Sequence, residues 1–331
     1  MIKTLARAVG LLGGVLAVSG AVWADSWNVR MHLNQPASMT SYHYVFATHF
    51  AEKAEEYTGG RFTVTIFPGA QLGRDPDAFQ QMQVGAIQTA VLAFPNLVEF
   101  YRPFNVFALP FLFDSFESAA RSFNGPTAAG LYADFEEQTG VKALGVFNGG
   151  FRGITNGVRR IDSVDDFAGL KIRVPGSPIL IATLESLGIS PVSISPGEVF
   201  TALQLRTVDG QESTVSWGYG QGFADVQSYV TETRHSVTGT GLYINADYFA
   251  DLPEDVQAAV QRAATEAVAH VNAVTRQYDL DVLDLYRDAG LEVTVIPVSD
   301  LRPRVLHIWE EYADEVGGLE VIEALVADGQ G

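Results

Sequence analysis

Two hydrophobic periodicities alternate along most of the chain. Apolar residues recur at every second position in runs such as 27–33 and 61–67, which is the spacing of strands with one buried face. Residues 40–58 instead follow the 3.6-residue helical spacing and stop at Gly59-Gly60, a common end for a helix. This alternation predicts an α/β protein with much parallel sheet.

Two features of the pattern indicate connections between domains. From Pro253 a helical pattern continues without a breaker to Gly290, and such a helix would exceed about 50 Å, more than one compact domain of this size needs. Gly149 and Gly150 interrupt an apolar strand beside Arg152. Glycines there are typical of a bulge or a close backbone approach, so we expect the chain to cross between domains at this point.

The N-terminus has the composition of a secretory signal peptide. Residues 1–7 are basic, an apolar stretch follows, and Val22-Trp23-Ala24 places small residues where signal peptidase reads them. We expect a signal peptide over 1–24, cut after Ala24, because the apolar stretch is too short and glycine-rich for a membrane anchor. The chain has no cysteine, so burial must stabilise it without disulfides, which favours the periplasm.

The charge balance limits the partners. The chain has 21 basic and 39 acidic residues and a formal net charge of −18; removal of 1–24 takes away only Lys3 and Arg7, which gives −20. Such a chain repels nucleic acid, and we expect no nucleic-acid partner. An anionic ligand would need a local, well-placed cation, because charges more than about 8–10 Å away are screened.

Familiar catalytic motifs are absent from the sequence. It contains no GxxxxGK[ST] loop, no GxGxxG after a strand, no GxSxG elbow and no HExxH pair. Its six histidines are not at metal-ligand spacing, and there are no thiols. We therefore expect no catalytic residues, no metal and no cofactor; a periplasmic enzyme with an unrecognised site stays an alternative.

Three segments carry a resemblance to a known family: IFPGAQLGRD at 66–75, DSVDDFAGLKIRVPGSP at 162–178 and SPGEVFTALQLRTVDGQES at 195–213. With FALPFLF at 107–113 and LPEDVQAAV at 252–260, they resemble the DctP-type substrate-binding proteins of tripartite ATP-independent periplasmic (TRAP) transporters.

The resemblance implies a two-domain periplasmic binding protein with a ligand cleft between the domains and a long helix spanning both. The expected division places 25–150 and 239–278 in domain I, and 151–238 and 279–331 in domain II.

The resemblance also gives Arg173, in KIRVP, the role of binding the ligand carboxylate through a bidentate salt bridge. Arginine suits that role because its planar guanidinium offers a fork of N–H donors that matches two carboxylate oxygens and stays charged. Arg152 corresponds to an arginine that also reaches the ligand in some relatives, and a structural ion pair is the alternative for it.

Further ligand contacts are expected around the same cleft. Ser213 follows VDGQE where relatives commonly carry an asparagine, so the ligand is expected to have more room there or to be held through water. Trp217 is either a cleft wall or a core residue, and His235 either a ligand contact or a structural hydrogen-bonding residue. Residues at the ends of first-domain strands complete the set, because α/β ligand sites gather outside the carboxyl ends of strands: Phe94, Asn96 and Asn34.

These features predict a solute receptor that captures a small organic acid, a monocarboxylate or dicarboxylate. The resemblance implies a permease with a small and a large membrane subunit as its partner. A receptor for signalling, whose closure presents a surface to a sensor, is the first alternative.

Overall fold

The computed structural model describes residues 26–330, so the expected signal peptide and its cleavage site lie outside the described residues. One nine-stranded sheet organises the chain, with strand order β2-β1-β3-β8-β4-β7-β5-β6 and with β9 paired to β8. Five of its eight strand pairings are parallel, which confirms the expected α/β class with much parallel sheet. The strands are β1 (Trp27–Leu33), β2 (Phe62–Phe67), β3 (Thr89–Ala93), β4 (Val141–Asn156), β5 (Lys171–Val174), β6 (Ser190–Ser193), β7 (Gly210–Thr214), β8 (Tyr229–Asn245) and β9 (Glu292–Val295).

Helices flank this sheet throughout residues 26–330. The α-helices are α1 (Tyr42–Thr58), α2 (Asp75–Gln83), α3 (Phe116–Phe123), α4 (Pro126–Thr139), α5 (Pro178–Ser186), α6 (Val199–Gln204), α7 (Val215–Gly220), α8 (Ala246–Ala250), α9 (Glu254–Asp288), α10 (Val298–Val305), α11 (His307–Glu311) and α12 (Leu319–Gln330). Short 3₁₀ helices are η1 (Phe94–Asn96), η2 (Arg102–Ala108), η3 (Val164–Phe167), η4 (Pro196–Glu198), η5 (Phe223–Asp225) and η6 (Asp314–Val316). No helix among residues 26–330 is both long and apolar enough to cross a membrane.

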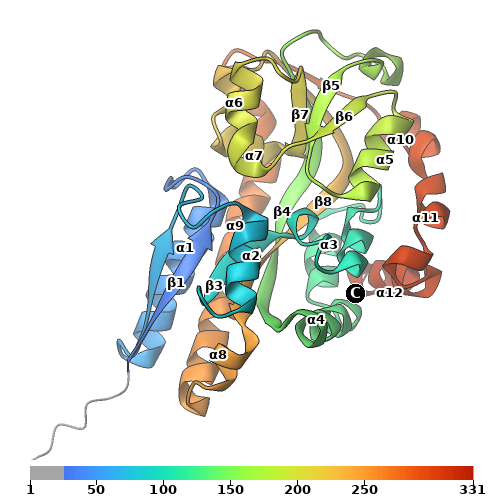
Figure 1. Ribbon diagram of the computed structural model, residues 1–331. Coiled ribbons are helices and arrows are strands. Elements are labelled where there is room, and N and C mark those ends of the chain that lie inside the picture. The colour runs from blue at the N-terminus through green and yellow to red at the C-terminus, as the bar shows by residue number, and fades with distance from the viewer. Residues whose placement is uncertain (1–25, 331) are drawn as a thin grey trace, which may run out of the picture.

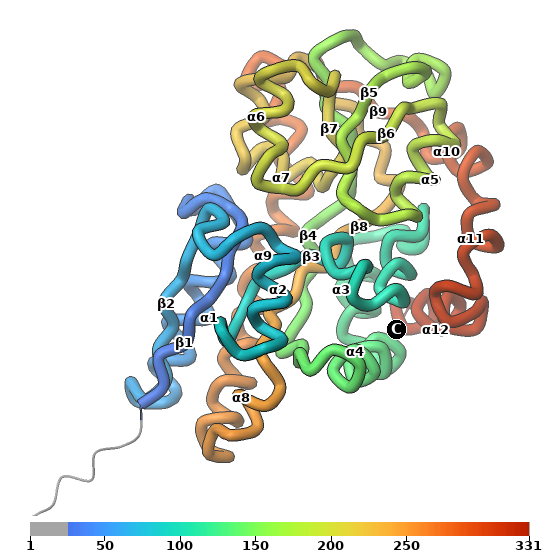
Figure 2. Tube along the Cα trace, in the orientation of Figure 1, coloured from blue at the N-terminus to red at the C-terminus, as the bar shows by residue number. Residues whose placement is uncertain are grey.

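Three long elements join the two ends of the molecule. Strands β4 and β8, of 16 and 17 residues, pair antiparallel through the middle, and the 35-residue helix α9 runs alongside them (Figure 1). The predicted helix from Pro253 to Gly290 is confirmed, with Pro253 as its N-cap residue. We call β1–β3 with α1–α4 the first lobe, and β5–β7 with α5–α7 the second lobe (Figure 2).

The crossing of β4 is irregular where the glycines predicted it. The pairing of β4 with β8 shifts register between Asn148 and Phe151 and again between Phe151 and Gly153. Gly150 has a φ of 101°, which favours glycine, and a Cβ on Gly153 would lie 2.9 Å from the carbonyl oxygen of Thr231. The glycines therefore allow the distortion that carries β4 from one lobe to the other.

Helices of the first lobe pack against neighbouring strands of the sheet. In the first lobe α1 begins after Ser41 and ends at Gly59, whose φ of 62° is the left-handed C-cap expected from the sequence. Part of the phenylalanine-rich stretch 100–116 forms η2, and Phe104 and Phe107 of this helix pack against Phe94 in the core. At the end of the chain, α12 packs against α3 and α4. The domain boundaries given above stay a prediction.

Candidate functional site

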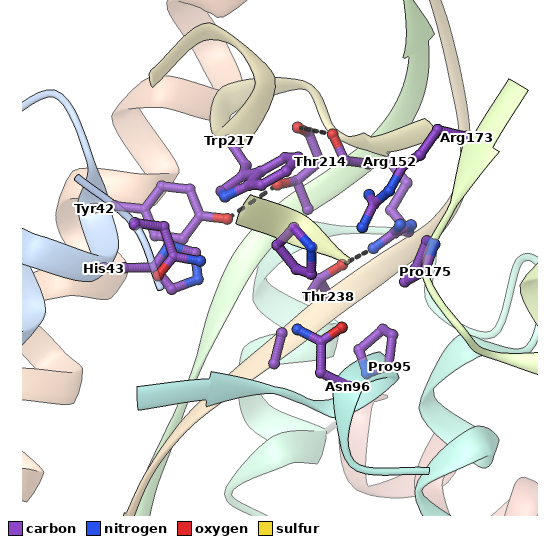
Figure 3. A pocket seen from close by; sticks show the side chains of 14 residues that line it. Tyr42, His43, Pro95, Asn96, Arg152, Arg173, Pro175, Thr214, Trp217 and Thr238 are labelled. Carbon is purple, nitrogen blue, oxygen red and sulfur yellow. Dashed lines mark hydrogen bonds between the residues drawn. The ribbon is translucent and has the colours of Figure 1, made fainter. Parts of the chain in front are cut away.

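A pocket lies between the lobes, where several strands and helices end. It has an empty volume of about 390 Å³, including its open mouth, and first-lobe residues from α1, β3 and η1 face second-lobe residues from β5, β7 and α7. Figure 3 shows many of these side chains converging on the same space. The lining residues are Gln35, Tyr42, His43, Ala93, Pro95, Asn96, Arg152, Arg173, Pro175, Pro196, Ser213, Thr214, Trp217 and Thr238.

Arg173 is a buried cation whose hydrogen-bonding capacity is only partly used. It sits on β5, which pairs with β6 and β7, and only 2% of it is exposed. Its Nε donates to the carbonyl oxygen of Ile194 at 2.8 Å and its Nη1 to that of Glu212 at 3.5 Å, whereas Nη2 has no hydrogen-bond partner among residues 26–330. Burial, followed by the repulsion of Arg152, lowers the pKa of Arg173 to about 9. The Nη2 of this guanidinium can therefore donate hydrogen bonds to an anion in the pocket.

The second arginine is already paired. The Nη2 of Arg152 donates to Oε2 of Glu212 at 2.7 Å, its Nε bonds the other carboxylate oxygen, and its Nη1 donates to the Thr238 hydroxyl at 2.5 Å. The two partners' side chains are 4% and 0% exposed. His235 Nε2 lies 3.1 Å from Oε1 of Glu212, and its Nδ1 lies 2.7 Å from the Thr233 hydroxyl. Such geometry is the strong, bidentate form of an ion pair, so Glu212 neutralises Arg152.

Glu212 is ionised in this arrangement despite complete burial. Burial alone would raise the pKa of its carboxyl, but the charge and hydrogen bonds of Arg152, with a smaller contribution from His235, outweigh burial and bring that pKa to about 2.

Tyr42 and His43, in the first turn of α1, form the aromatic wall on the first-lobe side. Their ring centroids are 4.4 Å apart with planes at 23°, and the Tyr42 hydroxyl lies 3.0 Å from that of Thr214 on β7 (Figure 3). Burial lowers the pKa of His43 to about 3, against a smaller opposing effect of Asp75. The imidazole is therefore neutral at ordinary pH, and its Nδ1 has no hydrogen-bond partner in the described part of the chain.

The burial of the neutral His43 imidazole predicts how the stability of the folded protein changes at acidic pH. Between about pH 6.5 and pH 3 the unfolded chain binds a proton at residue 43 that the folded protein does not, so stability is lost as pH falls. Replacing His43→Phe removes this proton and should reduce the loss between pH 8 and pH 5 by about 2 kcal/mol. Urea unfolding across that range measures it; equal slopes for both proteins would show that His43 is not buried as described.

A buried carboxylate holds the polar wall of the first lobe. Asp75, 2% exposed, accepts a hydrogen bond from Asn34 at 2.9 Å and lies 3.0 Å from Nε2 of His32, both through Oδ1. Its Oδ2 accepts from Nδ2 of Asn96 at 2.7 Å. Asp75 thus fixes Asn96 at the pocket, while Asn34 lies behind it.

The structure brings five of the eight predicted residues together at the pocket: Arg173, Arg152, Ser213, Trp217 and Asn96. The other three lie outside its lining. Asn34 bonds Asp75, Phe94 packs in the aromatic core of the first lobe, and His235 bonds Glu212. Each of these three therefore has a structural partner, and direct ligand contact by any of the eight stays a prediction.

Several lining residues were not identified from the sequence. Gln35 follows the first strand and could have been found by the reasoning that selected Asn34, since both stand at its carboxyl end. Tyr42 and His43 lie in a helical pattern that does not reveal which end faces a ligand. Thr214 and Thr238 carry no motif of their own. Glu212, which is outside the lining but pairs with Arg152, drew attention only as part of VDGQE.

Comparison with known proteins identifies relatives across most of the chain. Residues 33–315 match the family described as bacterial extracellular solute-binding protein, family 7 (DctP). The chain is 30% identical over 289 residues to the C4-dicarboxylate-binding periplasmic protein DctP of Rhodobacter capsulatus, covering 85% of each chain.

Among solved structures, the sugar acid binding protein DctPAm of Advenella mimigardefordensis in complex with galactonate has a TM-score of 0.87 at 26% identity, covering 92% of this chain and 98% of that one. A TRAP periplasmic solute-binding protein of Shewanella oneidensis with bound succinate has a TM-score of 0.85 at 28% identity, covering 92% and 99%.

Proposed function

Because the chain belongs to bacterial extracellular solute-binding protein family 7, the periplasmic receptors of TRAP transporters, we propose that it captures a small organic acid at Arg173 between its lobes. The relatives above are named for C4-dicarboxylates and sugar acids or hold galactonate and succinate, and all of these ligands are carboxylates. A carboxylate is the anion that a guanidinium fork recognises best.

One observation carries the proposal: the guanidinium of Arg173 is buried, and its Nη2 has no hydrogen-bond partner within the part of the chain that the structure describes. A buried charge without its counterion is costly, whereas in an open, wet cleft water would hydrate it. A carboxylate therefore stabilises the closed arrangement more than the open one. Ligand binding and closure are coupled by that difference in affinity.

The finer parts of the proposal follow from the family. The mature receptor, released by cleavage after Ala24, delivers the acid to a permease with a small and a large membrane subunit and performs no reaction itself. Membership of a solute-binding family does not favour the signalling or enzyme alternatives.

A thermal-shift screen of organic acids tests the proposal. A ligand at about 100 times its dissociation constant adds roughly 2.7 kcal/mol, which should raise the unfolding midpoint by about 5 °C or more. The bound acid should be recovered unchanged after denaturation, and its turnover would support the enzyme alternative. If no carboxylate in a broad panel shifts the midpoint, the proposed function is wrong.

A further inference from the structure

We propose, building on the function proposed above, that the ligand is a monoanion: a hydroxylated monocarboxylate, which this receptor selects over dicarboxylates. The inference concerns the substrate class of the same pocket. Three observations carry it: the net charge of the pocket, the carboxylates next to it, and the neutral polar groups that face the first lobe.

The net charge around the pocket matches one negative charge. Among the lining residues the cations are Arg152 and Arg173, and Glu212 neutralises Arg152 through two hydrogen bonds. Within the described lining, the positive charge of Arg173 is the one left without a paired counterion. A dicarboxylate would bring a second buried charge for which the described lining offers no free cation, and such a charge is expensive.

An acidic cavity adjoins the pocket. It has an empty volume of about 610 Å³ and shares Pro95, Asn96, Pro175 and Pro196 with the pocket, so a longer ligand would extend into it. Its charged lining residues in the described part of the chain are Asp75 and Glu99. A second ligand carboxylate would therefore approach like charges, which acts against dianions.

The groups facing the rest of the ligand are neutral and suit hydroxyls. Gln35 Oε1 and His43 Nδ1 are buried in the pocket lining, and no residue between 26 and 330 forms a hydrogen bond with either atom. An amide oxygen only accepts hydrogen bonds, so a ligand hydroxyl satisfies it, whereas an ionised carboxylate cannot. The neutral imidazole of His43 likewise pairs with a hydroxyl without adding charge.

Three four-carbon acids test the preference for hydroxyls and the preference for a single negative charge separately. Calorimetric titration of refolded, ligand-free protein at neutral pH measures the affinity for each acid. D-Erythronate has three hydroxyls, butyrate has none, and succinate has a second carboxylate. We expect D-erythronate to bind at least about tenfold more tightly than butyrate, and succinate no more tightly than butyrate. Succinate binding as tightly as D-erythronate would overturn the inference, and so would binding of none of the monocarboxylates.

Two variants test the groups responsible. Gln35→Leu should lower the affinity for D-erythronate about tenfold and leave the affinity for butyrate unchanged. Glu212→Gln releases the charge of Arg152 and should raise the succinate-to-erythronate affinity ratio about tenfold or more, whereas Asp165→Asn, at an exposed pair with Arg304, should not change it. Unchanged affinities in Gln35→Leu would contradict the contact between Gln35 and a ligand hydroxyl. If Glu212→Gln does not fold, the relative affinities of the wild-type protein for succinate and D-erythronate still test the preference for a monoanion.

Failure of this inference differs from failure of the proposed function. Succinate binding that outcompetes D-erythronate and is lost in Arg173→Lys removes the monoanion preference but keeps a carboxylate receptor. Acids that bind equally well to Arg173→Lys remove both.

Discussion

We expect Arg173→Lys to lower the affinity for the proposed carboxylate ligand about 100-fold or more. Lysine keeps the charge but replaces the planar fork with a single ammonium, so it cannot donate two parallel hydrogen bonds to one carboxylate. It would also lose the bond from Nε to the carbonyl oxygen of Ile194 that fixes the direction of the guanidinium. Truncating one partner of a buried charge pair typically costs about 2–5 kcal/mol of binding free energy, and 100-fold corresponds to about 2.7 kcal/mol.

Titration calorimetry with the tightest acid from the screen measures this effect. Arg206→Lys is the matched control, because Arg206 is exposed and its replacement makes the same chemical change away from the pocket. The control should bind like the wild-type protein. Wild-type affinity in Arg173→Lys, with the fold intact by circular dichroism, would refute the role of Arg173.

The fold could be predicted where a local signal determines structure. Gly59 ends α1 because only a residue tolerant of positive φ fits the C-cap, and the unbroken periodicity after Pro253 required one long helix. The position of Arg173 at the pocket could be predicted from the KIRVP motif and its resemblance to a family.

The rest of the site depends on contacts between distant parts of the chain. Arg152 and Glu212 are 60 residues apart, and they meet because β4 and β7 pair in one register. Sequence reasoning left Arg152 open between a ligand contact and an ion pair; it lines the pocket and is paired as well. His43 is likewise a helical residue in the sequence, and only the packing of the lobes makes it a neutral pocket wall.

The ion pair of Arg152 and Glu212 therefore determines the net charge of the pocket, and it also stabilises the folded protein. Glu212→Gln should lower the free energy of unfolding by about 3–5 kcal/mol, because it leaves the Arg152 guanidinium buried without its counterion. Asp165→Asn is the control, since its pair with Arg304 is exposed and should be worth less than about 1 kcal/mol. Urea unfolding measures both; a loss in Glu212→Gln no larger than the control's would contradict the assignment.

The pH dependence of this loss identifies its electrostatic origin. The pKa of Glu212 is about 2 in the folded protein against 4.5 ordinarily, so its stabilisation is present above about pH 4.5 and is lost as pH falls toward 2. A pKa difference of that size corresponds to about 3 kcal/mol at neutral pH. Glutamine does not titrate, so the stability gap between wild type and Glu212→Gln should narrow by roughly half near pH 3. A gap that stays constant with pH would mean that the variant loses packing rather than the ion pair.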